Sequence, residues 1–376
     1  MLLFPFGGGT PAFETLAFAS RSNSPFDQSE QAEGSMETDE RKKSAVVTGA
    51  EGFIGSTLVR ELVEQGWDVI GLHFPGSDLM RLEGVPVILR PCDILVPSDL
   101  ENAIPENIDA LFHLAADVRI TSRRSGDQHA INIDGTKNVI EAAMKKKVGR
   151  FLFTSSMAAF GLHDARIDET TQSNAIESSI SYFMTKRLGE LEVDKAIEQG
   201  LDAVMVNPSN VVGPRDVKNM PATYIRLVQG KKIPLIGAGA ASFCHVEDVA
   251  KAMVSCIKKG RTGERYLLGG ADATYYELGR LIQTIAGGQA PIFAVPGWLF
   301  RLGARIVALF AAMRGAHNLL TREMALVLTS TMLVDSSKAI NELGYKPSSL
   351  EKMLRDEIDW LADNAYLGKR TAWVWR

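Results

Sequence analysis

The chain has 376 residues, of which 41 are Lys or Arg and 45 are Asp or Glu, so it is long enough for a large core and its charge is close to balanced. This balance removes the electrostatic case for a nucleic-acid partner. The three cysteines, Cys92, Cys244 and Cys256, lie far apart without CxxC spacing, and the six histidines show no ligand spacing. We therefore expect a reduced compartment, no disulfide framework and no metal site.

The first 43 residues differ from the rest. Residues 20–40 are mostly polar and net acidic, which predicts that segment 1–43 is disordered. The opening residues lack a basic region and are interrupted by proline and glycine, so they make a poor signal peptide, and we expect a cytoplasmic protein. Met36, just upstream of the first predicted strand, is an alternative start.

A glycine-rich turn follows that strand. Residues 44–56 read SAVVTGAEGFIGS, an apolar β-branched run that breaks into a turn and then an apolar-periodic helix. Gly49 would allow the sharp exit from the strand, Gly52 the approach of a pyrophosphate to the backbone, and Gly55 close packing of the helix. The start of the helix would then offer N–H groups and the positive end of its dipole to the phosphates. An ordinary glycine-rich loop is the alternative, but strand, turn and helix together favour a nucleotide site.

The second predicted strand, 68–72, ends at His73. At this position an acidic residue would bond the ribose 2′-OH of NAD and repel the phosphate of NADP. No acid stands at the strand tip, and Ser77 and Arg81 follow shortly after it. The sequence therefore favours NADP over NAD, with Asp78 close enough to complicate the choice.

Two further strands are predicted at 86–90 and 108–116. Asp93 follows the first of them and would bond an adenine amino group, although a turn-forming role is nearly as common. The second runs into the small residues Ala115 and Ala116, which would let a cofactor lie against the backbone. A long helix at about 126–146 follows and carries Asn132; a plain packed helix is its alternative interpretation.

The fifth predicted strand delivers hydroxyl groups at its carboxyl end, in Thr154, Ser155 and Ser156. Tyr182 and Lys186 then lie four residues apart, on one face of a helix. Alone, this YxxxK pair is more often a surface feature, but after a hydroxyl-bearing fifth strand it indicates catalysis. A sixth strand is expected at 201–206.

Beyond Asn207 the strict alternation of strands and helices ends. We expect an excursion at 220–241, a helix and last sheet strand within 243–270, and a mostly helical remainder with one short strand near 292–295. His245 and Asp248 could form a catalytic pair but fit a network at a helix start better. The apolar stretch 296–314 has three interpretations: a core helix, a lid over an apolar substrate, or an interfacial helix that contacts lipid.

Taken together, these motifs resemble the extended short-chain dehydrogenase/reductase family from Ser44 to near the C-terminus. Within it, the chain is most similar to the branch of dihydroflavonol 4-reductases, 3β-hydroxysteroid dehydrogenases and hopanoid-associated sugar epimerases. It departs from the pattern at His73, where many relatives carry Arg, and at Thr185, where Ser is usual. The residues that carry the resemblance are TGAEGFIG at 48–55, Asp93, HLAA at 113–116, NIDGT at 132–136, TSS at 154–156, Tyr182, Lys186, Asn207, Pro208, GP at 213–214 and HVEDV at 245–249.

The resemblance implies a Rossmann-type α/β fold, a doubly wound parallel sheet with a smaller, mostly helical C-terminal lobe. The dinucleotide domain would comprise 44–206 and 243–270, and the substrate lobe 207–242 and 271–376. Tyr182 would be the acid or base, with its pKa lowered by Lys186 and an oxidised nicotinamide, and Ser156 would bond the substrate oxygen. The implied cofactor contacts are Gly49, Gly52, Phe53, Ile54, Gly55, His73, Asp93, Ile94, Leu114, Ala115, Ala116, Asn132, Thr154, Tyr182, Lys186, Asn207 and Pro208.

Three functions follow from this resemblance. The first is an NAD(P)-dependent reductase or dehydrogenase acting on a carbonyl or secondary alcohol of a bulky or apolar small molecule. The second is a nucleotide-sugar 4-epimerase with tightly bound NAD, for which Arg215 is the one cation near the expected cleft. The third is a non-catalytic NAD(P)-binding sensor. Dehydration is disfavoured because Met157 and Ala158 stand where dehydratases have an acidic pair. A homodimer through the helices that carry Asn132 and Tyr182 is also implied.

Overall fold

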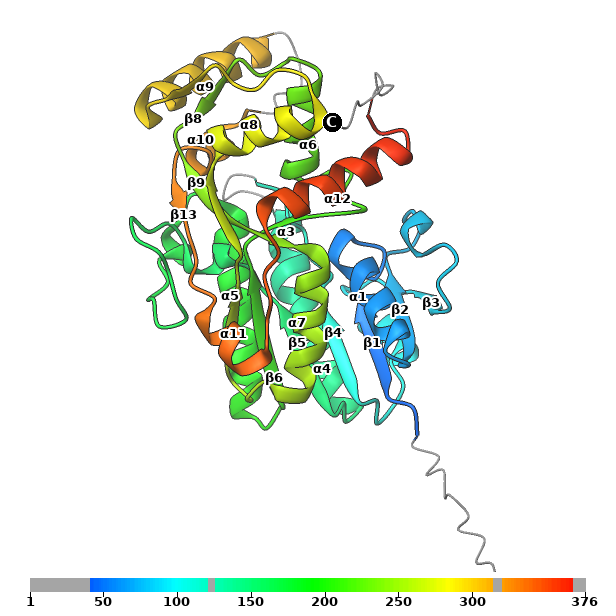
Figure 1. The fold of residues 1–376 in the computed structure, drawn as a ribbon. Helices are drawn as coiled ribbons and strands as arrows, with labels where there is room; N and C mark the ends of the chain where they lie inside the picture. The colour runs from blue at the N-terminus through cyan, green and yellow to red at the C-terminus, as the bar shows by residue number, and fades with distance from the viewer. Residues whose placement is uncertain (1–40, 121–125, 314–319, 368–376) are drawn as a thin grey trace, which may run out of the picture. The chain divides into compact units, whose positions relative to one another are not determined.

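Seven parallel strands make up the central sheet of the described residues, which are 41–120, 126–313 and 320–367 of this computed structural model (Figure 1). From Lys42 onward these residues belong to one compact unit. The segment 1–40, where we predicted disorder and an alternative start at Met36, lies outside them. The order across the sheet is β10 (Arg265–Leu268), β6 (Ala203–Pro208), β5 (Arg150–Thr154), β4 (Ala110–His113), β1 (Ser44–Thr48), β2 (Asp68–His73) and β3 (Ile88–Pro91).

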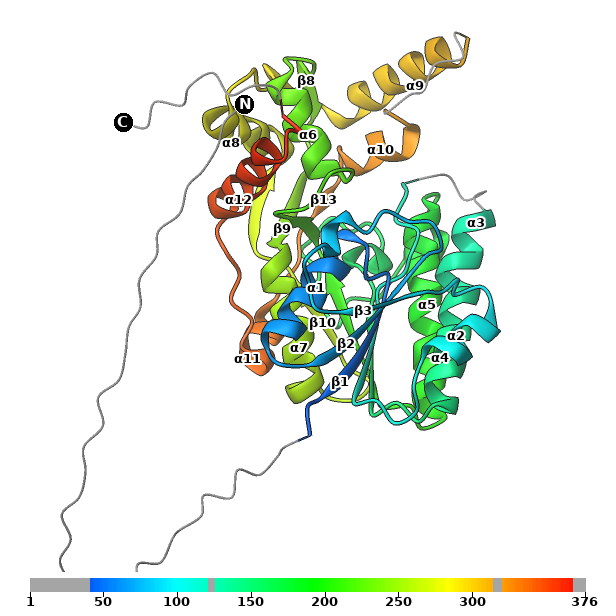
Figure 2. The same cartoon turned by 90° about the vertical axis from the view of Figure 1, so that its right-hand side faces the viewer.

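Helices cover both faces of this sheet, as Figure 2 shows. The apolar side chains of α1, α7 and α11 form one buried cluster with the sheet, and those of α2, α4 and α5 form another on the opposite face. Strands buried on both sides explain the continuous apolar runs in the sequence. These helices are α1 (Phe53–Glu64), α7 (Val246–Lys259), α11 (Ser337–Leu343), α2 (Pro97–Ala103), α4 (Gly135–Lys145) and α5 (Ser181–Glu198).

The chain reverses its direction across the sheet at β1. It proceeds outward from β1 to β2 and β3, then returns to place β4 on the other side of β1. Ligands of open α/β sheets bind at the carboxyl ends of strands where such a reversal occurs. The fold therefore puts the glycine turn, which follows β1, at the expected binding position.

The predicted helix at 126–146 contains an irregular turn. It consists of α3 (Gly126–His129), a π-helical turn η2 (Ala130–Asp134) and α4. A π-helical turn inserts one extra residue into a helix and often marks a functional site. The residue directly after it is Gly135. A side chain does not fit at this position, because a Cβ there would lie 2.6 Å from Ile94 Cδ1.

A second sheet, which we did not predict, lies beyond the sixth strand. In it β9 (Ala240–His245) pairs with β7 (Asn210–Val212), β11 (Ala271–Thr274) and β13 (Thr331–Met332). Residues 243–245, which we assigned to the dinucleotide domain, belong to this sheet, whereas α7 directly after them packs on α1. A two-stranded ribbon joins β8 (Leu235–Gly237) to β12 (Phe293–Val295), the short strand expected near 292–295.

The C-terminal part is otherwise helical, as predicted. Its longest helix, α9, is not a core helix in its described part: Ala304 is the one buried side chain among residues 297–308. None of the helices in the described part of the chain has the length and apolar character required to cross a membrane. The remaining elements are α6 (Met220–Gln229), α8 (Tyr275–Ala286), α9 (Gly297–Met313), α10 (Arg322–Val327), α12 (Leu350–Asp363) and the short helical turns η1 (Met80–Leu82), η3 (Met157–Phe160) and η4 (Ala175–Glu177).

Gly55 provides a test of how α1 packs on the glycine turn. A Cβ at Gly55 would lie 2.0 Å from the carbonyl oxygen of Gly49, so Gly55→Ala must displace the helix from the turn. We expect the free energy of unfolding to fall by about 1–3 kcal/mol, measured by urea denaturation. Gly303→Ala, where a Cβ meets nothing within 4 Å, is the control and should not destabilise the protein. Equal stability of the two variants would contradict the close packing.

Candidate active site

A cavity of about 580 Å³ opens at the carboxyl ends of β1, β2 and β4, where the sheet reverses its order. Eight of the predicted cofactor contacts line it, from the glycine turn, the tip of β2, the segment after β3 and the segment after β4. The cavity therefore extends from the expected phosphate site to the expected ribose and adenine sites. These eight residues are Gly49, Gly52, His73, Asp93, Ile94, Leu114, Ala115 and Ala116.

The glycine turn has the geometry of a phosphate cradle. Gly49 has a φ of +67°, and a Cβ there would lie 2.8 Å from the backbone nitrogen of Ala115, so the turn and the segment after β4 meet backbone to backbone. Gly52 is the N-cap of α1 and offers no side chain to the first N–H groups of the helix. Phe53, Ile54 and Gly55 form that first turn, which carries no acidic residue. An anion at the mouth of the cavity would meet these N–H groups.

Glu51 is the cavity residue that sequence reasoning overlooked. It belongs to the glycine turn but reaches the tip of β2, where its Oε1 accepts hydrogen bonds from Phe74 N at 3.0 Å and Ser77 Oγ at 3.3 Å. Its Oε2 is buried and has no hydrogen-bond partner among the described residues. An acid therefore does stand at the position where we had found none in the sequence of the second strand. Glu51 lines the cavity together with His73, at the expected ribose site.

A buried histidine holds β1, β4 and α4 together beneath this cavity. Thr48 Oγ1 lies 2.8 Å from His113 Nδ1, and His113 Nε2 lies 3.1 Å from Thr136 Oγ1. Because Thr136 donates its own hydrogen to Asn132 O, the ring must donate from Nε2 and accept from Thr48 at Nδ1. Burial, followed by the charge of Lys186, lowers the pKa of His113 to about 3, so the ring is neutral.

Asn132 is saturated by contacts within the protein. Its amide donates to Asp117 O at 2.9 Å and to Thr185 Oγ1 at 3.0 Å, while its Oδ1 accepts from Asp117 N at 2.8 Å. It does not line the cavity. Asn132 thus connects the segment after β4 to Thr185 of α5, and its predicted contact with the cofactor stays a prediction.

The three predicted catalytic side chains meet at the carboxyl end of β5. Ser156 follows the strand, and its side chain lies close enough to Tyr182, in the first turn of α5, to act on the pKa of the phenol. One turn further along α5, Lys186 donates from Nζ to Thr154 O at 2.7 Å and lies 5.1 Å from the centre of the Phe153 ring. The hydroxyl groups of Ser156 and Tyr182 and the ammonium group of Lys186 are thus brought together at the end of β5.

Burial shifts the pKa values of Tyr182 and Lys186. Burial raises the pKa of Tyr182, and the nearby side chain of Ser156 opposes this shift. The lowering by Lys186 together with an oxidised nicotinamide, which the resemblance implied, stays a prediction for the protein with its cofactor bound. Burial lowers the pKa of Lys186 to about 8, and the nearby charge of Glu190 opposes this lowering. Because the pKa of Tyr182 is raised, its phenol keeps the proton at neutral pH.

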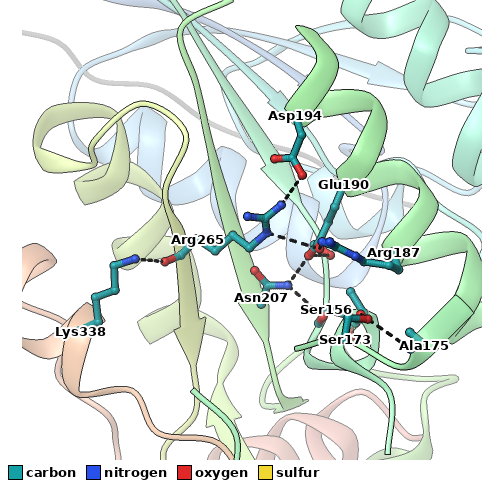
Figure 3. Close-up of polar contacts among 11 residues, drawn as sticks. Ser156, Ser173, Ala175, Arg187, Glu190, Asp194, Asn207, Arg265 and Lys338 are labelled. Carbon is teal, nitrogen blue, oxygen red and sulfur yellow. Dashed lines mark hydrogen bonds and ion pairs between the residues drawn. The ribbon is translucent and has the colours of Figure 1, made fainter. Parts of the chain in front are cut away.

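Glu190, one turn after Lys186, is a buried carboxylate that sequence reasoning missed (Figure 3). Its Oε1 accepts from Ser155 Oγ at 2.7 Å and from Asn207 Nδ2 at 2.6 Å. Its Oε2 pairs with Arg187 Nη1 at 2.8 Å. Asn207 also donates to Ser156 O at 3.0 Å, so Glu190 fixes both sides of the strand end that carries the catalytic serine. The spacing of four residues from Lys186 was the available signal for this role.

The remaining predicted contacts lie at β5 and β6 rather than in the cavity. Thr154 Oγ1 and Asn207 Oδ1 are buried without a hydrogen-bond partner among the described residues. Each could form a hydrogen bond with a ligand or a water molecule. Pro208 ends β6, pairs with Leu268 of β10 and is buried. Asp93 accepts from Leu95 N at 2.9 Å, as a turn-forming Asp does, and it also lines the cavity, so its contact with adenine stays a prediction.

His245 and Asp248 form a network at the start of α7, as the structural interpretation predicted. His245 is the N-cap of this helix and its Nδ1 accepts from Glu247 N at 3.2 Å, while its Nε2 lies 3.2 Å from Asp356 Oδ2. Asp248 accepts from Ser348 N at 2.8 Å. Both residues therefore tie α7 to the C-terminal segment. Within the described residues, no group of three or more His, Cys, Asp or Glu side chains could hold a metal ion.

The lowered pKa of Lys186 predicts a pH dependence of stability. The unfolded lysine binds its proton up to pH 10.5, whereas the folded one releases it near pH 8, so stability should rise with pH between these values. Relative to Lys186→Met, we expect the wild-type free energy of unfolding to gain about 2 kcal/mol from about pH 7.5 to 9.5, measured by urea denaturation. Lys195→Met, an exposed position on α5, is the control and should keep the wild-type pH dependence. A constant difference between wild type and Lys186→Met would show that Lys186 is not desolvated.

Comparison with known proteins places this geometry in a family. The model of the NAD dependent epimerase/dehydratase family matches residues 45–269. A dihydroflavonol 4-reductase-like protein of Synechocystis is 31% identical over 328 residues, which is 85% of this chain and 95% of that protein. Sterol demethylase protein B of Methylococcus capsulatus is 28% identical over 86% of this chain and 100% of that protein.

A solved structure shows the same arrangement of elements. The crystal structure of gox2253 matches with a TM-score of 0.77 and 31% identity, covering 87% of this chain and 100% of that chain. The predicted doubly wound fold and the predicted resemblance to the extended short-chain dehydrogenases/reductases are confirmed. With its glycine cradle, its tyrosine and its lysine on one sheet edge, the chain belongs to the NAD dependent epimerase/dehydratase family.

Proposed function

We propose that this protein is a reductase that transfers hydride from a nicotinamide cofactor to a carbonyl group of an apolar small molecule. The observation that carries the proposal is the placement of Ser156, Tyr182 and Lys186 together at the end of β5, where burial raises the pKa of the phenol. A reduction requires a proton for the substrate oxygen, and a phenol that keeps its proton at neutral pH can supply it. The retention of both Tyr182 and Lys186 argues against a non-catalytic sensor.

Each member of the trio has a distinct task. Tyr182 donates the proton to the substrate oxygen, and Ser156 hydrogen-bonds the same oxygen and orients it. Lys186, held by Thr154 O, places a positive charge behind the phenol that stabilises the phenolate left after proton transfer. The dinucleotide, when bound, supplies the hydride. Gly49, Gly52 and the first turn of α1 would hold its phosphates.

The surroundings of Tyr182 support an apolar substrate. Its ring packs against a hydrophobic cluster that joins η3 and the start of α5 to the second sheet and the C-terminal helices. Met157 and Phe160 of η3 and Ile180 before α5 are buried members of this cluster. A substrate that reaches the phenol would therefore enter along mostly apolar surface. A dihydroflavonol 4-reductase-like protein, a tetraketide alpha-pyrone reductase and a sterol demethylase protein are among the relatives by name.

The position of Arg215 argues against the alternative, a nucleotide-sugar 4-epimerase. Its guanidinium donates to Thr57 Oγ1 of α1 at 3.3 Å and lies 4.0 Å from Glu247 Oε1 of α7. The one cation that we considered for clamping a nucleotide diphosphate is thus engaged with side chains of α1 and α7.

The cofactor we propose is NAD, although the sequence of the second strand favoured NADP, and three contacts at the tip of β2 support this choice. The carboxylate of Glu51 stands at the tip of β2 and would repel a 2′-phosphate. Ser77 is hydrogen-bonded to Glu51 and to Phe74 O. The guanidinium of Arg81 is directed at Arg215 O, at 2.9 Å, and at Glu51 O, at 3.4 Å. Neither Ser77 nor Arg81 lines the cavity.

The role of Tyr182 is tested by Tyr182→Phe. We expect kcat for the oxidation of NADH with aryl and steroid ketones to fall by at least about 100-fold, because the proton donor is lost while the ring is kept. NAD affinity, measured by thermal shift, should stay within about twofold, since the cavity lies at β1, β2 and β4. Tyr276→Phe, on α8, is the matched control and should retain activity. Retained activity in Tyr182→Phe would exclude this assignment. A different outcome would favour the epimerase: a wild-type protein that retains NAD through gel filtration and does not reduce any ketone.

The role of Glu51 is tested by Glu51→Gln. The substitution removes the negative charge at the tip of β2, so we expect the Kd of NADP relative to that of NAD to fall by at least about tenfold. Fluorescence titration with both reduced cofactors measures this ratio. Glu83→Gln, an exposed position after η1, is the control and should leave it unchanged. The proposal fails if the wild type already binds NADP more tightly than NAD.

A further inference from the structure

Helix α9 presents its apolar side to solvent. Residues four apart form one exposed row, in which Trp298 is 67% exposed and Leu302 and Ile306 are 47% and 50% exposed. Leu299 and Val307, also exposed, form a second row beside it. In a surface helix of a globular protein the apolar side normally faces the core. This helix reverses the normal arrangement.

The orientation of α9 is fixed by contacts on its other side. Ala304 is buried, Phe300 is half-buried against the C-terminal cluster, and Arg301 Nη1 donates to Thr329 Oγ1 at 3.0 Å. The helix contacts α10 and β8. Figure 1 and Figure 2 both draw α9 at the margin of the C-terminal part, with the other elements on one side of it. The apolar rows are therefore held outward.

The exposed apolar surface continues onto the ribbon before α9. Leu235 of β8 pairs with Phe293 of β12, and both are exposed, as is Ile292. Of the 17 large apolar side chains that are exposed in the described part of the chain, eight lie on α9 and this ribbon, so they form a patch rather than the usual scatter. The α9 patch consists of Leu235, Ile292, Phe293, Trp298, Leu299, Leu302, Ile306 and Val307.

The segments that build this patch carry positive charge only. Residues 217–246 contain four Lys or Arg and no Asp or Glu, and residues 278–322 contain five Lys or Arg and no Asp or Glu, in a chain of net charge −4. Lys231 and Lys232, just before β8, and Arg305 of α9 are exposed. The occupant of the patch must therefore be apolar inside and anionic at its edge. A second copy bound through the same patch would bring like charges together.

We propose that the α9 patch docks the protein onto a bilayer that contains anionic lipids. In this arrangement α9 lies in the plane of the interface, with Trp298, Leu302 and Ile306 among the upper acyl chains and Arg305 and the two lysines at the headgroups. Tryptophan is the side chain that favours this boundary. The docking is peripheral and stands independently of the reaction proposed above.

Vesicle co-sedimentation of the full chain tests the docking. The wild type should sediment with vesicles of phosphatidylcholine and about one-third phosphatidylserine, and less with phosphatidylcholine alone. The triple variant Trp298→Gln, Leu302→Gln and Ile306→Gln should partition at least about tenfold more weakly, because it loses three interfacial apolar groups. Ile88→Gln with Ile340→Gln, two exposed positions on β3 and α11, is the matched control and should bind as the wild type does.

A second variant keeps the proposal testable if the triple variant is unstable. Lys231→Glu, Lys232→Glu and Arg305→Glu, all at exposed positions, should abolish the preference for anionic vesicles. Thermal unfolding establishes that each variant is folded. The proposal is overturned if the wild type binds neither vesicle, or if the folded variants bind as the wild type does. It is also overturned if the wild type is a dimer that the triple variant converts to monomer, since the patch would then join two copies.

Discussion

The hydroxyl of Thr48 is the interaction on which the geometry of the site depends. It donates to His113 Nδ1 and accepts from the backbone N–H groups of Leu114 and Ala115, so the last residue of β1 ties down the segment that leaves β4. That segment meets Gly49 backbone to backbone. His113 in turn hydrogen-bonds to Thr136 at the start of α4. The point at which the sheet reverses its order is thus held by side-chain hydrogen bonds as well as by the ladder between strands.

Buried charge shapes the chemistry at the other end of the sheet. Lys186 and Glu190 lie one turn apart on α5, and both side chains are withdrawn from solvent. Burial disfavours the ammonium form of the lysine, and the carboxylate partly restores it. The same carboxylate holds Ser155 and Asn207, which frame the backbone of Ser156. One glutamate therefore influences both the charge behind the phenol and the position of the serine beside it.

The central sheet could be predicted from the sequence because its signals are local. Apolar runs of strand length alternate with helical periodicity, and glycine spacing marks the turn after β1, so each element is specified by its own residues. The second sheet escaped prediction because β7, β9, β11 and β13 are two to six residues long and lie far apart in the sequence, so that Thr331 of β13 pairs with Ala240 of β9. Short strands of this kind are specified by their partners, which a single sequence does not show.

The same distinction applies to the site. The glycines, Asp93, the small residues after β4 and the Tyr–Lys pair stand in recognisable order along the chain. Glu51 was overlooked because its importance comes from reaching a different strand, β2, across the cavity. The protonated state of Tyr182 depends on burial, which no residue spacing reveals. Sequence reasoning thus located the chemical groups, whereas their burial and the contacts of Glu51 required the fold.

The π-helical turn η2 also constrains how this chain can vary in length. Its additional residue lets Asn132 reach both Asp117 and Thr185, while Thr136 four residues later still donates to Asn132 O and meets His113. Removing one residue between 130 and 134 would rotate everything before it by about 100° relative to α4. The amide of Asn132 could then no longer face its partners. Substitutions in this turn are tolerable where they leave Asn132 unchanged, but insertions and deletions are not. Homologues with this site should therefore keep the length of the turn.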